Sequence, residues 1–299
     1  MFDQVTIIGC GLIGSSVFRA LKRNGTVKKI ISFDNNSSVK EIIKKENLSD
    51  EIFSNPGDAV KNADLVLVAT PLSSFETAIK SIKDYLKPNS ILTDTSSVKK
   101  SVDAIVKKIN LKNIIWVPAH PVAGTEKSGP TAGFADLFKD RWTILTPDSN
   151  IKNSEVKKVS FFWELIGSKV KIMSLDDHDK ILSLTSHLPH VIAYNIVKTA
   201  MGDNEKLKKD VVRYSAGGLR DFTRIAASDP IMWKDIFIDN SSLIIEGIEK
   251  FSKSLEEFKI AIKEKDSQKL LEIFEKSKEF RKLIIEAGQD TEKPDFGRK

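Results

Sequence analysis

A histidine that ends an apolar run is the most chemically informative residue of this chain. His120 stands in the segment 116–126, where a strand-like run leads into the imidazole and then into a sharp turn. An imidazole takes up a proton near neutral pH, so it can act as a general base. Ligands of open parallel sheets bind just beyond the carboxyl ends of the strands. We therefore predict that His120 is a catalytic base on the last strand of such a sheet.

A glycine-rich loop near the N-terminus indicates a dinucleotide site. The run Gly9-Cys10-Gly11-Leu12-Ile13-Gly14 follows an apolar strand and opens an amphipathic helix, and Asp34 comes twenty residues after its last glycine. In this motif the glycines permit a tight turn, close approach of the backbone to the pyrophosphate, and close packing of the helix, whose N-terminus faces the phosphate charge. The predicted cofactor-binding residues are Gly9, Gly11, Leu12, Ile13, Gly14, Asp34 and Thr70.

The acidic residue of this motif also bears on the choice of cofactor. The Asp34 carboxylate can accept hydrogen bonds from an adenosine ribose but repels a 2′-phosphate, and no arginine follows it to pair with that phosphate. Two charges about 4 Å apart at a partly exposed site interact by roughly 1 to 4 kcal/mol, which is ample for tenfold discrimination. We therefore predict NAD, and not NADP, as the cofactor.

Strands and helices alternate in the first half of the chain. The predicted strands are Val5–Ile8, Lys29–Phe33, Asp64–Ala69, Ile91–Thr93 and Ile114–Val117, with helices near 12–23, 37–46, 72–86 and 97–109. This alternation predicts an α/β doubly wound parallel sheet of the Rossmann type. A strand at 142–145, a helix at 151–166 and a strand at 170–173 are expected to extend the same layer.

The second half offers helical patterns and no clear strand. Leu182–Met201 is mostly apolar, which predicts a buried helix that kinks or starts at Pro189. An apolar stripe, Phe251, Leu255, Phe258 and Ile262, could pack in a core or against a second subunit, and we favour an all-α dimerisation domain. The expected domains are 1–173 for the dinucleotide, 174–290 for substrate and homodimer formation, and a disordered tail over 291–299.

Composition narrows the class of protein. The chain has 299 residues, a net charge of +6 and one cysteine, Cys10, which leaves no internal disulfide and fits a reducing cytoplasm. No apolar run reaches the roughly 18 residues of a membrane helix, and no export signal precedes the first strand. The lysines are spread and paired with glutamates, so we expect a solvated lysine-rich surface and no nucleic acid, and an anionic small substrate is compatible with this charge. The acidic run 176–179 is interpreted as a charged helix start, not a metal site.

Three further segments complete a resemblance. They are Thr93–Lys99, Ser186–His190 and Gly217–Trp233, the last of which contains DFTRIAASDPIMW. Together with the glycine loop and HPVAGTE at 120–126, they resemble the prephenate dehydrogenase family (TyrA-type prephenate and arogenate dehydrogenases) from Val5 to the 280s. The resemblance implies NAD-dependent oxidative decarboxylation of prephenate to 4-hydroxyphenylpyruvate, a step of tyrosine biosynthesis. It also implies that His120 accepts the proton of the ring hydroxyl.

The resemblance carries over further site residues one by one. Ser97 matches a serine that orients both hydroxyl and histidine, although by itself it also fits a helix N-cap. Arg224 matches an arginine that binds a substrate carboxylate, for which a planar guanidinium is suited. The other implied substrate-binding positions are Ser186, His190, Thr125, Glu126, Gly217, Asp221, at a dimer interface, and Trp233. His187 points away from His190 on the helix and is interpreted as structural.

Three alternatives stay open at this stage. Arogenate dehydrogenase performs the same reaction on a substrate with an amine in its side chain. A β-hydroxyacid dehydrogenase or imine reductase shares the two-domain plan, but generally uses a base from the helical domain. A non-catalytic NAD-binding regulatory protein would not need the base, serine and arginine together. The span of the two domains leaves no room for a chorismate mutase or ACT domain, so we expect a monofunctional enzyme on which any feedback by tyrosine acts at the substrate pocket.

Overall fold

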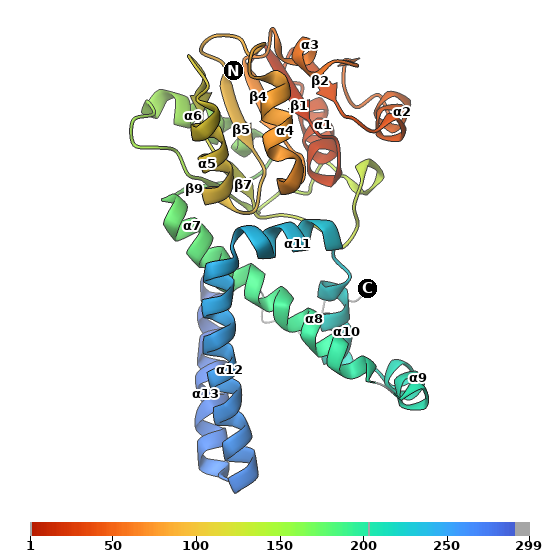
Figure 1. Ribbon diagram of the computed structural model, residues 1–299, viewed down its shortest axis with the longest axis vertical. Coiled ribbons are helices and arrows are strands. Elements are labelled where there is room, and N and C mark those ends of the chain that lie inside the picture. Colours follow the sequence, from red (N-terminus) through yellow and green to blue (C-terminus); the bar gives the residue numbers. More distant parts are fainter. Residues whose placement is uncertain (1, 203, 291–299) are drawn as a thin grey trace. The chain divides into compact units, whose positions relative to one another are not determined.

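A six-stranded parallel sheet forms the centre of the first part of the chain (Figure 1). The computed structural model describes residues 2–202 and 204–290. The strands are β1 (Gln4–Ile8), β2 (Lys29–Phe33), β3 (Glu51–Ile52), β4 (Leu65–Val68), β5 (Ile91–Asp94) and β6 (Ile115–Trp116). Their order is β3-β2-β1-β4-β5-β6, the doubly wound order of dinucleotide-binding folds. The predicted α/β fold is confirmed, although the short β3 was missed.

Helices cover both faces of this sheet. They are α1 (Leu12–Asn24), α2 (Ser37–Lys45), α3 (Pro56–Val60), α4 (Leu72–Ile82), α5 (Lys99–Ile109) and α6 (Asn153–Leu165). Leu65 and Leu67 of β4 belong to one buried cluster, together with α1 and α6, whereas Val66 and Val68 belong to another, together with α4 and α5. Successive side chains of a strand point to opposite faces, so a strand covered on both faces reads as a continuous apolar run.

His120 lies on a second, smaller sheet and not on the last strand of the main one. β7 (Ala119–Pro121), β8 (Trp142–Leu145) and β9 (Lys169–Ile172) form this sheet, and β7 runs antiparallel to β8. The expectation that β8 and β9 extend the main layer is therefore wrong. The physical reason is Pro118, which has no N–H for the ladder that ends with the bond from Val117 N to Leu92 O.

The helical segment that follows begins with three consecutive pieces. α7 (Leu175–Leu182) passes through a π-helical turn (Ser183–His187) into α8 (Leu188–Met201), which carries Pro189 in its first turn. Proline is tolerated there because the first N–H groups of a helix have no partner. Among the described residues of α8, only Ala193 is fully buried. The expectation of a buried helix is therefore wrong for the single chain, in which α8 packs against α10 (Gly217–Ala226).

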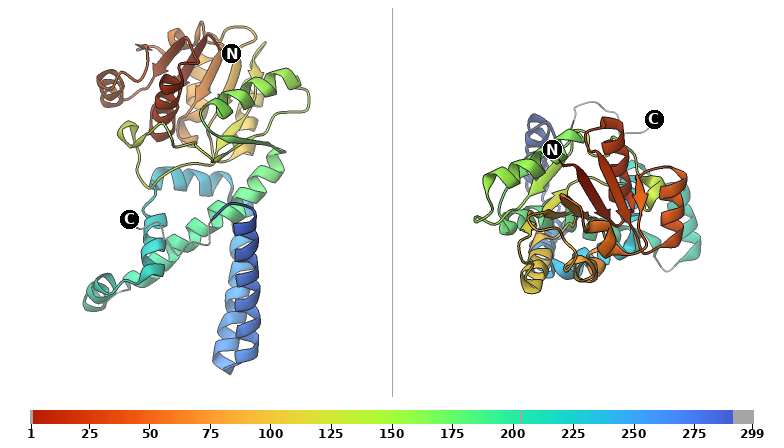
Figure 2. Two further views of the ribbon diagram at one scale, coloured as in Figure 1. Left: turned by 180° about the vertical axis from the view of Figure 1, so that it is seen from behind. Right: turned by 90° about the horizontal axis from the view of Figure 1, so that it is seen from above.

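α11 (Pro230–Asp239) attaches the helical segment to the sheet, following α9 (Glu205–Arg213) and α10. Trp233 and Ile236 of α11 pack on Val98, at the start of α5, in a small apolar cluster. Asp235 accepts a hydrogen bond of 3.1 Å from the backbone N of Ser73 in the first turn of α4, where the helix dipole favours a carboxylate. α11 therefore lies across the helix N-termini that follow β4 and β5 (Figure 2).

The chain divides into two compact units, with the break after Ile244. The second unit contains most of α12 (Ser241–Glu264) and α13 (Ser267–Glu286), which form a helical hairpin in which the rings of Phe258 and Phe274 lie 6.2 Å apart. The predicted stripe is on α12, and its Leu255 and Ile262 are exposed by 56% and 62%. The tail expected to be disordered, 291–299, lies outside the described residues. No described helix is both long and apolar enough to cross a membrane.

Candidate active site

A cavity of about 760 Å³ opens at the carboxyl ends of β1, β4, β5 and β7, within the first unit. It is lined by the glycine loop, by the start of α4, by the loop that precedes α5, and by parts of α8, α10 and α11. His120 and Arg224 both line it, although they are far apart in the sequence. The predicted site residues among its lining are Gly11, Leu12, Ile13, Thr70, Ser97, His120, Thr125, Glu126, Ser186, His190, Arg224 and Trp233.

The glycine loop leaves room for a ligand on one side only. A Cβ atom on Gly9, whose φ is +91°, would lie 2.7 Å from Ala69 O, and one on Gly14 would lie 2.2 Å from Gly9 O. These two glycines are thus required for the turn and for the packing of α1. A Cβ on Gly11 would meet nothing within 4 Å, and Gly11 faces the cavity. This is the open approach that a pyrophosphate needs.

Polar groups at this end of the cavity fit a dinucleotide. The N-cap of α1 forms no side-chain capping bond, so the amides of its first turn are available to phosphate oxygens. The Thr70 hydroxyl is buried in the cavity wall without a hydrogen-bond partner among the described residues. Asp34 lies at the end of β2, outside the cavity lining, and accepts hydrogen bonds from Cys10 N at 2.8 Å and Asn36 N at 2.9 Å. The carboxylate is therefore fixed beside the loop, where a ribose is expected.

All four histidines of the chain line this cavity or contact a residue that lines it. His120 lines it and also contacts the buried His178. His120 is only 7% exposed, and its Nδ1 lies 2.8 Å from Nε2 of His178. Burial, followed by His178, Lys99 and His187, holds the pKa of His120 well below its ordinary value. The imidazole is therefore neutral at physiological pH and able to accept a proton.

His178 and Asp179 are buried partners of His120 that the sequence interpretation missed. Nδ1 of His178 lies 2.7 Å from Oδ1 of Asp179, and both side chains are 0% exposed. Segment 176–179 does start α7, with Asp176 and Asp177 in the first turn, as expected. The available signal was the spacing of His178, Asp179 and Leu182, which share the buried side of α7.

Ser97 does not cap α5, so that interpretation is wrong. The helix begins at Lys99, and Asp179 from α7 caps it by accepting bonds from the backbone N of Lys99 at 2.8 Å and of Lys100 at 3.0 Å. Because the cap comes from another helix, the Ser97 hydroxyl is left free of bonds to described residues and lines the cavity on the same wall as His120.

A buried ion pair lies beneath this wall. Nζ of Lys99 contacts Asp94 Oδ2 at 2.5 Å and Ala119 O at 2.6 Å, and neither charged side chain is exposed. Asp94 Oδ1 accepts a further bond of 2.9 Å from Ala119 N. Burial lowers the pKa of Lys99, against the attraction of Asp94. The pair fixes the backbone of the residue next to His120 and places a positive charge near the imidazole.

The wall from the helical segment carries the predicted carboxylate clamp. The Arg224 side chain is exposed to the cavity and forms no ion pair with the part of the chain that the structure describes. His190 stacks on Trp233 with ring centroids 3.5 Å apart, and its Nδ1 lies 2.8 Å from Ser186 O. His187 also lines the cavity, but its Nδ1 lies 3.0 Å from Nδ2 of the buried Asn240, as expected for a structural residue.

Two of the predicted substrate residues lie elsewhere. Gly217 and Asp221 are on α10, outside the cavity lining. Thr125 and Glu126 are exposed at its mouth, where Thr125 Oγ1 accepts a bond of 3.2 Å from Lys127 N.

No group of acidic, histidine and cysteine side chains among residues 2–202 and 204–290 is arranged to hold a metal ion.

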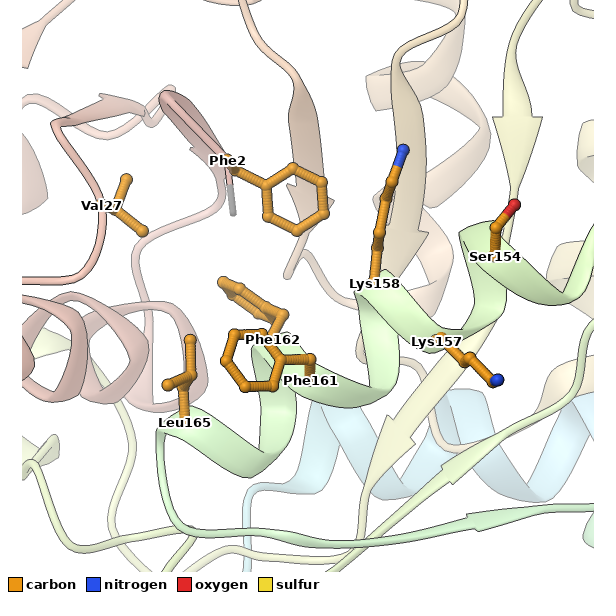
Figure 3. Close-up of a pocket in the computed structure, with 8 residues that line it drawn as sticks. All are labelled: Phe2, Val27, Ser154, Lys157, Lys158, Phe161, Phe162 and Leu165. Atoms are coloured by element: carbon orange, nitrogen blue, oxygen red, sulfur yellow. The ribbon is translucent and has the colours of Figure 1, made fainter.

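A smaller hollow of about 200 Å³ beside α6 is of a different kind (Figure 3). Phe2, Phe161, Phe162 and Leu165 turn toward one another in it, and Lys158 stands at its edge. Its described lining is mainly apolar and contains no histidine, carboxylate or cysteine, and it lies away from the glycine loop, His120 and Arg224. The chemistry is therefore expected in the large cavity.

Two family profiles and several relatives show the family of this chain. Residues 17–172 match the profile described as prephenate dehydrogenase, nucleotide-binding domain, and residues 174–276 match prephenate dehydrogenase, dimerization domain. A cyclohexadienyl dehydrogenase of Zymomonas mobilis is 40% identical over 290 residues, which are 97% of this chain and 98% of that protein. A prephenate dehydrogenase of Bacillus subtilis is 29% identical over 282 residues, covering 94% of this chain and 76% of that protein. The structure of the Aquifex aeolicus prephenate dehydrogenase with hydroxyphenyl propionate and NAD+ has a TM-score of 0.86 and 33% identity, covering 95% of this chain and 99% of that one.

Proposed function

Because this chain belongs to the prephenate dehydrogenase family, we propose that it oxidises prephenate with NAD and with loss of CO₂ to 4-hydroxyphenylpyruvate. The observation that carries the proposal is that a neutral, buried histidine and an arginine with no ion pair among the described residues line the same cavity as the glycine loop. Oxidation of a ring alcohol that bears carboxylates requires these three parts together.

His120 is the acceptor of the hydroxyl proton in this reaction. When bound, NAD supplies the acceptor for the hydride that leaves the ring carbon bearing the hydroxyl. The O–H bond breaks as the proton moves to the imidazole, and the carbon–oxygen bond becomes a carbonyl. Loss of the ring carboxylate as CO₂ returns an electron pair to the ring, and the imidazole then gives its proton back to the oxygen of the new phenol. Such general-base help is typically worth about 10² to 10⁴ in rate.

Arg224 and Ser97 complete the substrate site. The guanidinium of Arg224 is free of protein carboxylates among the described residues, and its planar donor groups can pair with a substrate carboxylate. The Ser97 hydroxyl, released from capping by Asp179, can hold the ring hydroxyl in line with His120. Trp233, His190 and Ser186 would then flank the ring, whereas Gly217 and Asp221 could act only from outside the cavity.

NAD is the cofactor that the residues fit. The open face of Gly11, the uncapped start of α1 and the orphaned Thr70 hydroxyl would hold the pyrophosphate and its neighbouring groups. Asp34 would accept bonds from the adenosine ribose. The fit is supported by the match to the nucleotide-binding domain and by the NAD+ complex of the Aquifex aeolicus enzyme.

We also propose the division into a nucleotide domain over 1–173 and a helical domain over 174–290 that forms a homodimer. The limits of the two family profiles support the division, and the dimerization-domain match and the exposed stripe on α12 support the homodimer. Feedback by tyrosine, which shares the hydroxyphenyl ring of the product, would act at the cavity itself. A cytoplasmic location is supported by the single buried Cys10.

Arogenate is the second candidate substrate. The Zymomonas mobilis relative carries the name cyclohexadienyl dehydrogenase, which refers to the ring common to prephenate and arogenate and not to the side chain. The test measures formation of the reduced cofactor by the purified protein with prephenate and with arogenate, each with NAD⁺ and NADP⁺, beside His120→Asn as the control with strongly reduced activity. We expect turnover of prephenate with NAD⁺. Turnover of arogenate alone would favour the second candidate. Turnover of neither substrate would refute the proposed dehydrogenase activity.

A further inference from the structure

A chain of three buried side chains leads from the cavity into the protein. His120 Nδ1 lies 2.8 Å from His178 Nε2, and His178 Nδ1 lies 2.7 Å from Asp179 Oδ1. His120 lines the cavity, whereas His178 and Asp179 do not. The two residues therefore cannot touch a substrate there and can act only through His120.

The positions of the protons on these three side chains follow from the charge of Asp179. Asp179 accepts hydrogen bonds from the backbone N of Lys99 and of Lys100 in addition to the one from His178. Burial acts against its charge, but these three bonds outweigh burial and lower the pKa of the Asp179 carboxyl. An ionised carboxylate only accepts hydrogen bonds, so Nδ1 of His178 must carry the proton.

The same reasoning gives the tautomer of His178 and then that of His120. Burial is the main cause that lowers the pKa of His178, so the ring is neutral and carries one proton. With that proton on Nδ1, its Nε2 is an acceptor, and Nδ1 of His120 must donate to it. The remaining nitrogen of His120, Nε2, is then left with a lone pair for a ligand in the cavity.

We propose that His178 and Asp179 are positioning residues that hold His120 in the tautomer with a protonated Nδ1 and an accepting Nε2. The proposal deepens the proposed function and rests on it for the identity of the hydroxyl that Nε2 receives. When the hydroxyl proton moves to Nε2, the O–H bond breaks, an N–H bond forms, and His120 becomes a cation with both nitrogens protonated. Its Nδ1–H still donates to His178, whose other side faces the Asp179 carboxylate, and no proton needs to leave His178.

This arrangement compensates for the other charges around His120. Lys99, His178 and His187 all act against protonation of the ring, as does burial. The Asp179 carboxylate is a favourable charge, which acts on His120 through His178. A resting imidazole that is neutral but can be stabilised as a cation during turnover is what a base in a buried site requires.

Asp179→Asn is the informative substitution because it can reverse the direction of the hydrogen bonds that join residue 179, His178 and His120. The amide oxygen can still accept from Lys100 N, while the amide NH₂ in the place of Oδ1 would give up the bond from Lys99 N, donate to His178 Nδ1 and move the His178 proton to Nε2. His178 would then donate to His120 Nδ1, and Nε2 of His120 would carry the proton that blocks its role as a base. A wrong tautomer of this kind costs about 10⁴ in kcat in serine proteases. We expect kcat to fall by about 10²- to 10⁴-fold with KM changed only a few-fold.

The first readout needs no substrate. Histidine ¹⁵N NMR of the full-length protein near neutral pH distinguishes the two tautomers of each ring, and the chain has only four histidines to assign, each by its own substitution. We expect an accepting Nε2 on His120 and a protonated Nδ1 on His178 in the unchanged protein, and the reverse on both in Asp179→Asn. The matched control is Asp103→Asn, which alters another buried carboxyl, the acceptor for Trp116 Nε1, and should leave the His120 tautomer and kcat unchanged.

The outcomes separate this proposal from the proposed function. A protonated Nε2 on His120 in the unchanged protein overturns the proposal, as does an Asp179→Asn protein with unchanged tautomers and kcat. If Asp179→Asn does not fold, the spectrum of the unchanged protein and the kcat of His178→Gln decide instead, with a loss of at least tenfold expected. The expected tautomers in a protein that turns over neither prephenate nor arogenate would support the positioning pair and refute the proposed function.

Discussion

Asp34 should control cofactor choice through its charge and loop geometry through its oxygens, and two substitutions separate these roles. Asp34→Asn removes the charge but keeps an oxygen that can accept the bond from Cys10 N, now 2.8 Å long. Asp34→Ala removes both. A carboxylate about 4 Å from a 2′-phosphate costs roughly 1 to 4 kcal/mol, which corresponds to a preference of about 5-fold to several hundred-fold for NAD⁺.

The two variants should therefore differ in a defined way. In Asp34→Asn, the ratio of kcat/KM with NAD⁺ to that with NADP⁺ should fall by at least about fivefold while the free energy of unfolding stays nearly unchanged. In Asp34→Ala, the Cys10 amide loses its acceptor, which costs about 1 to 3 kcal/mol when the group is shielded from water.

Steady-state kinetics with prephenate and both cofactors, together with urea unfolding, measure these quantities. If Asp34→Asn kept the cofactor ratio of the unchanged protein, the repulsion argument would be refuted. Equal stability of the alanine and asparagine variants would show that the bond to Cys10 N does not hold the loop.

Three further predictions concern the substrate site and the residues beneath it. Arg224→Ala should mainly raise KM for prephenate, whereas His120→Asn should mainly lower kcat, by about 10²- to 10⁴-fold; reversed profiles in steady-state assays would contradict both roles. Lys99→Met leaves the Asp94 carboxylate buried without its partner and should lower the free energy of unfolding by about 3 to 5 kcal/mol. The control Lys100→Met, which removes an exposed ion pair, should lower it by less than about 1 kcal/mol. Similar losses in the two variants would speak against a buried pair. Burial lowers the pKa of His187 from 6.5 to about 4, so between these values the unfolded chain binds the proton that the folded one resists, and stability is lost as the pH falls. Urea unfolding from pH 7 to pH 4 should show a loss that is about 3 kcal/mol smaller in His187→Asn than in the unchanged protein, and parallel curves would exclude this contribution.

The parts of the fold that sequence predicted well are those set by local pattern. The apolar runs of β1, β2, β4 and β5 and the helices between them repeat along the chain, and a sheet buried on both faces leaves few other solutions. The change of sheet at Pro118 was missed because β6 and β7 are nearly continuous in sequence, and only the pairing of β7 with β8 separates them. Burial of α8 was overestimated because packing against α10 covers most of its apolar residues only in part within a single chain.

The site residues that the sequence could predict are those that stand in a distinctive motif. His120, Arg224 and the glycine loop stand in distinctive segments, and the structure brings them to one cavity. His178 and Asp179 were missed because their role comes from contacts with β7 and α5, 58 and 80 residues away in sequence. Ser97 by itself also fitted an N-cap because a local rule places a serine before a helix, whereas the actual cap comes from another helix.

The most direct test of the central claim is a crystal structure of the dead-end complex with prephenate and NADH, in which the reduced cofactor cannot accept a hydride. His120 Nε2 should lie about 2.6 to 3.2 Å from the oxygen of the ring hydroxyl, with a substrate carboxylate on the guanidinium of Arg224. A ring hydroxyl that binds another side chain, or a substrate that reaches only one of these two residues, would contradict the account.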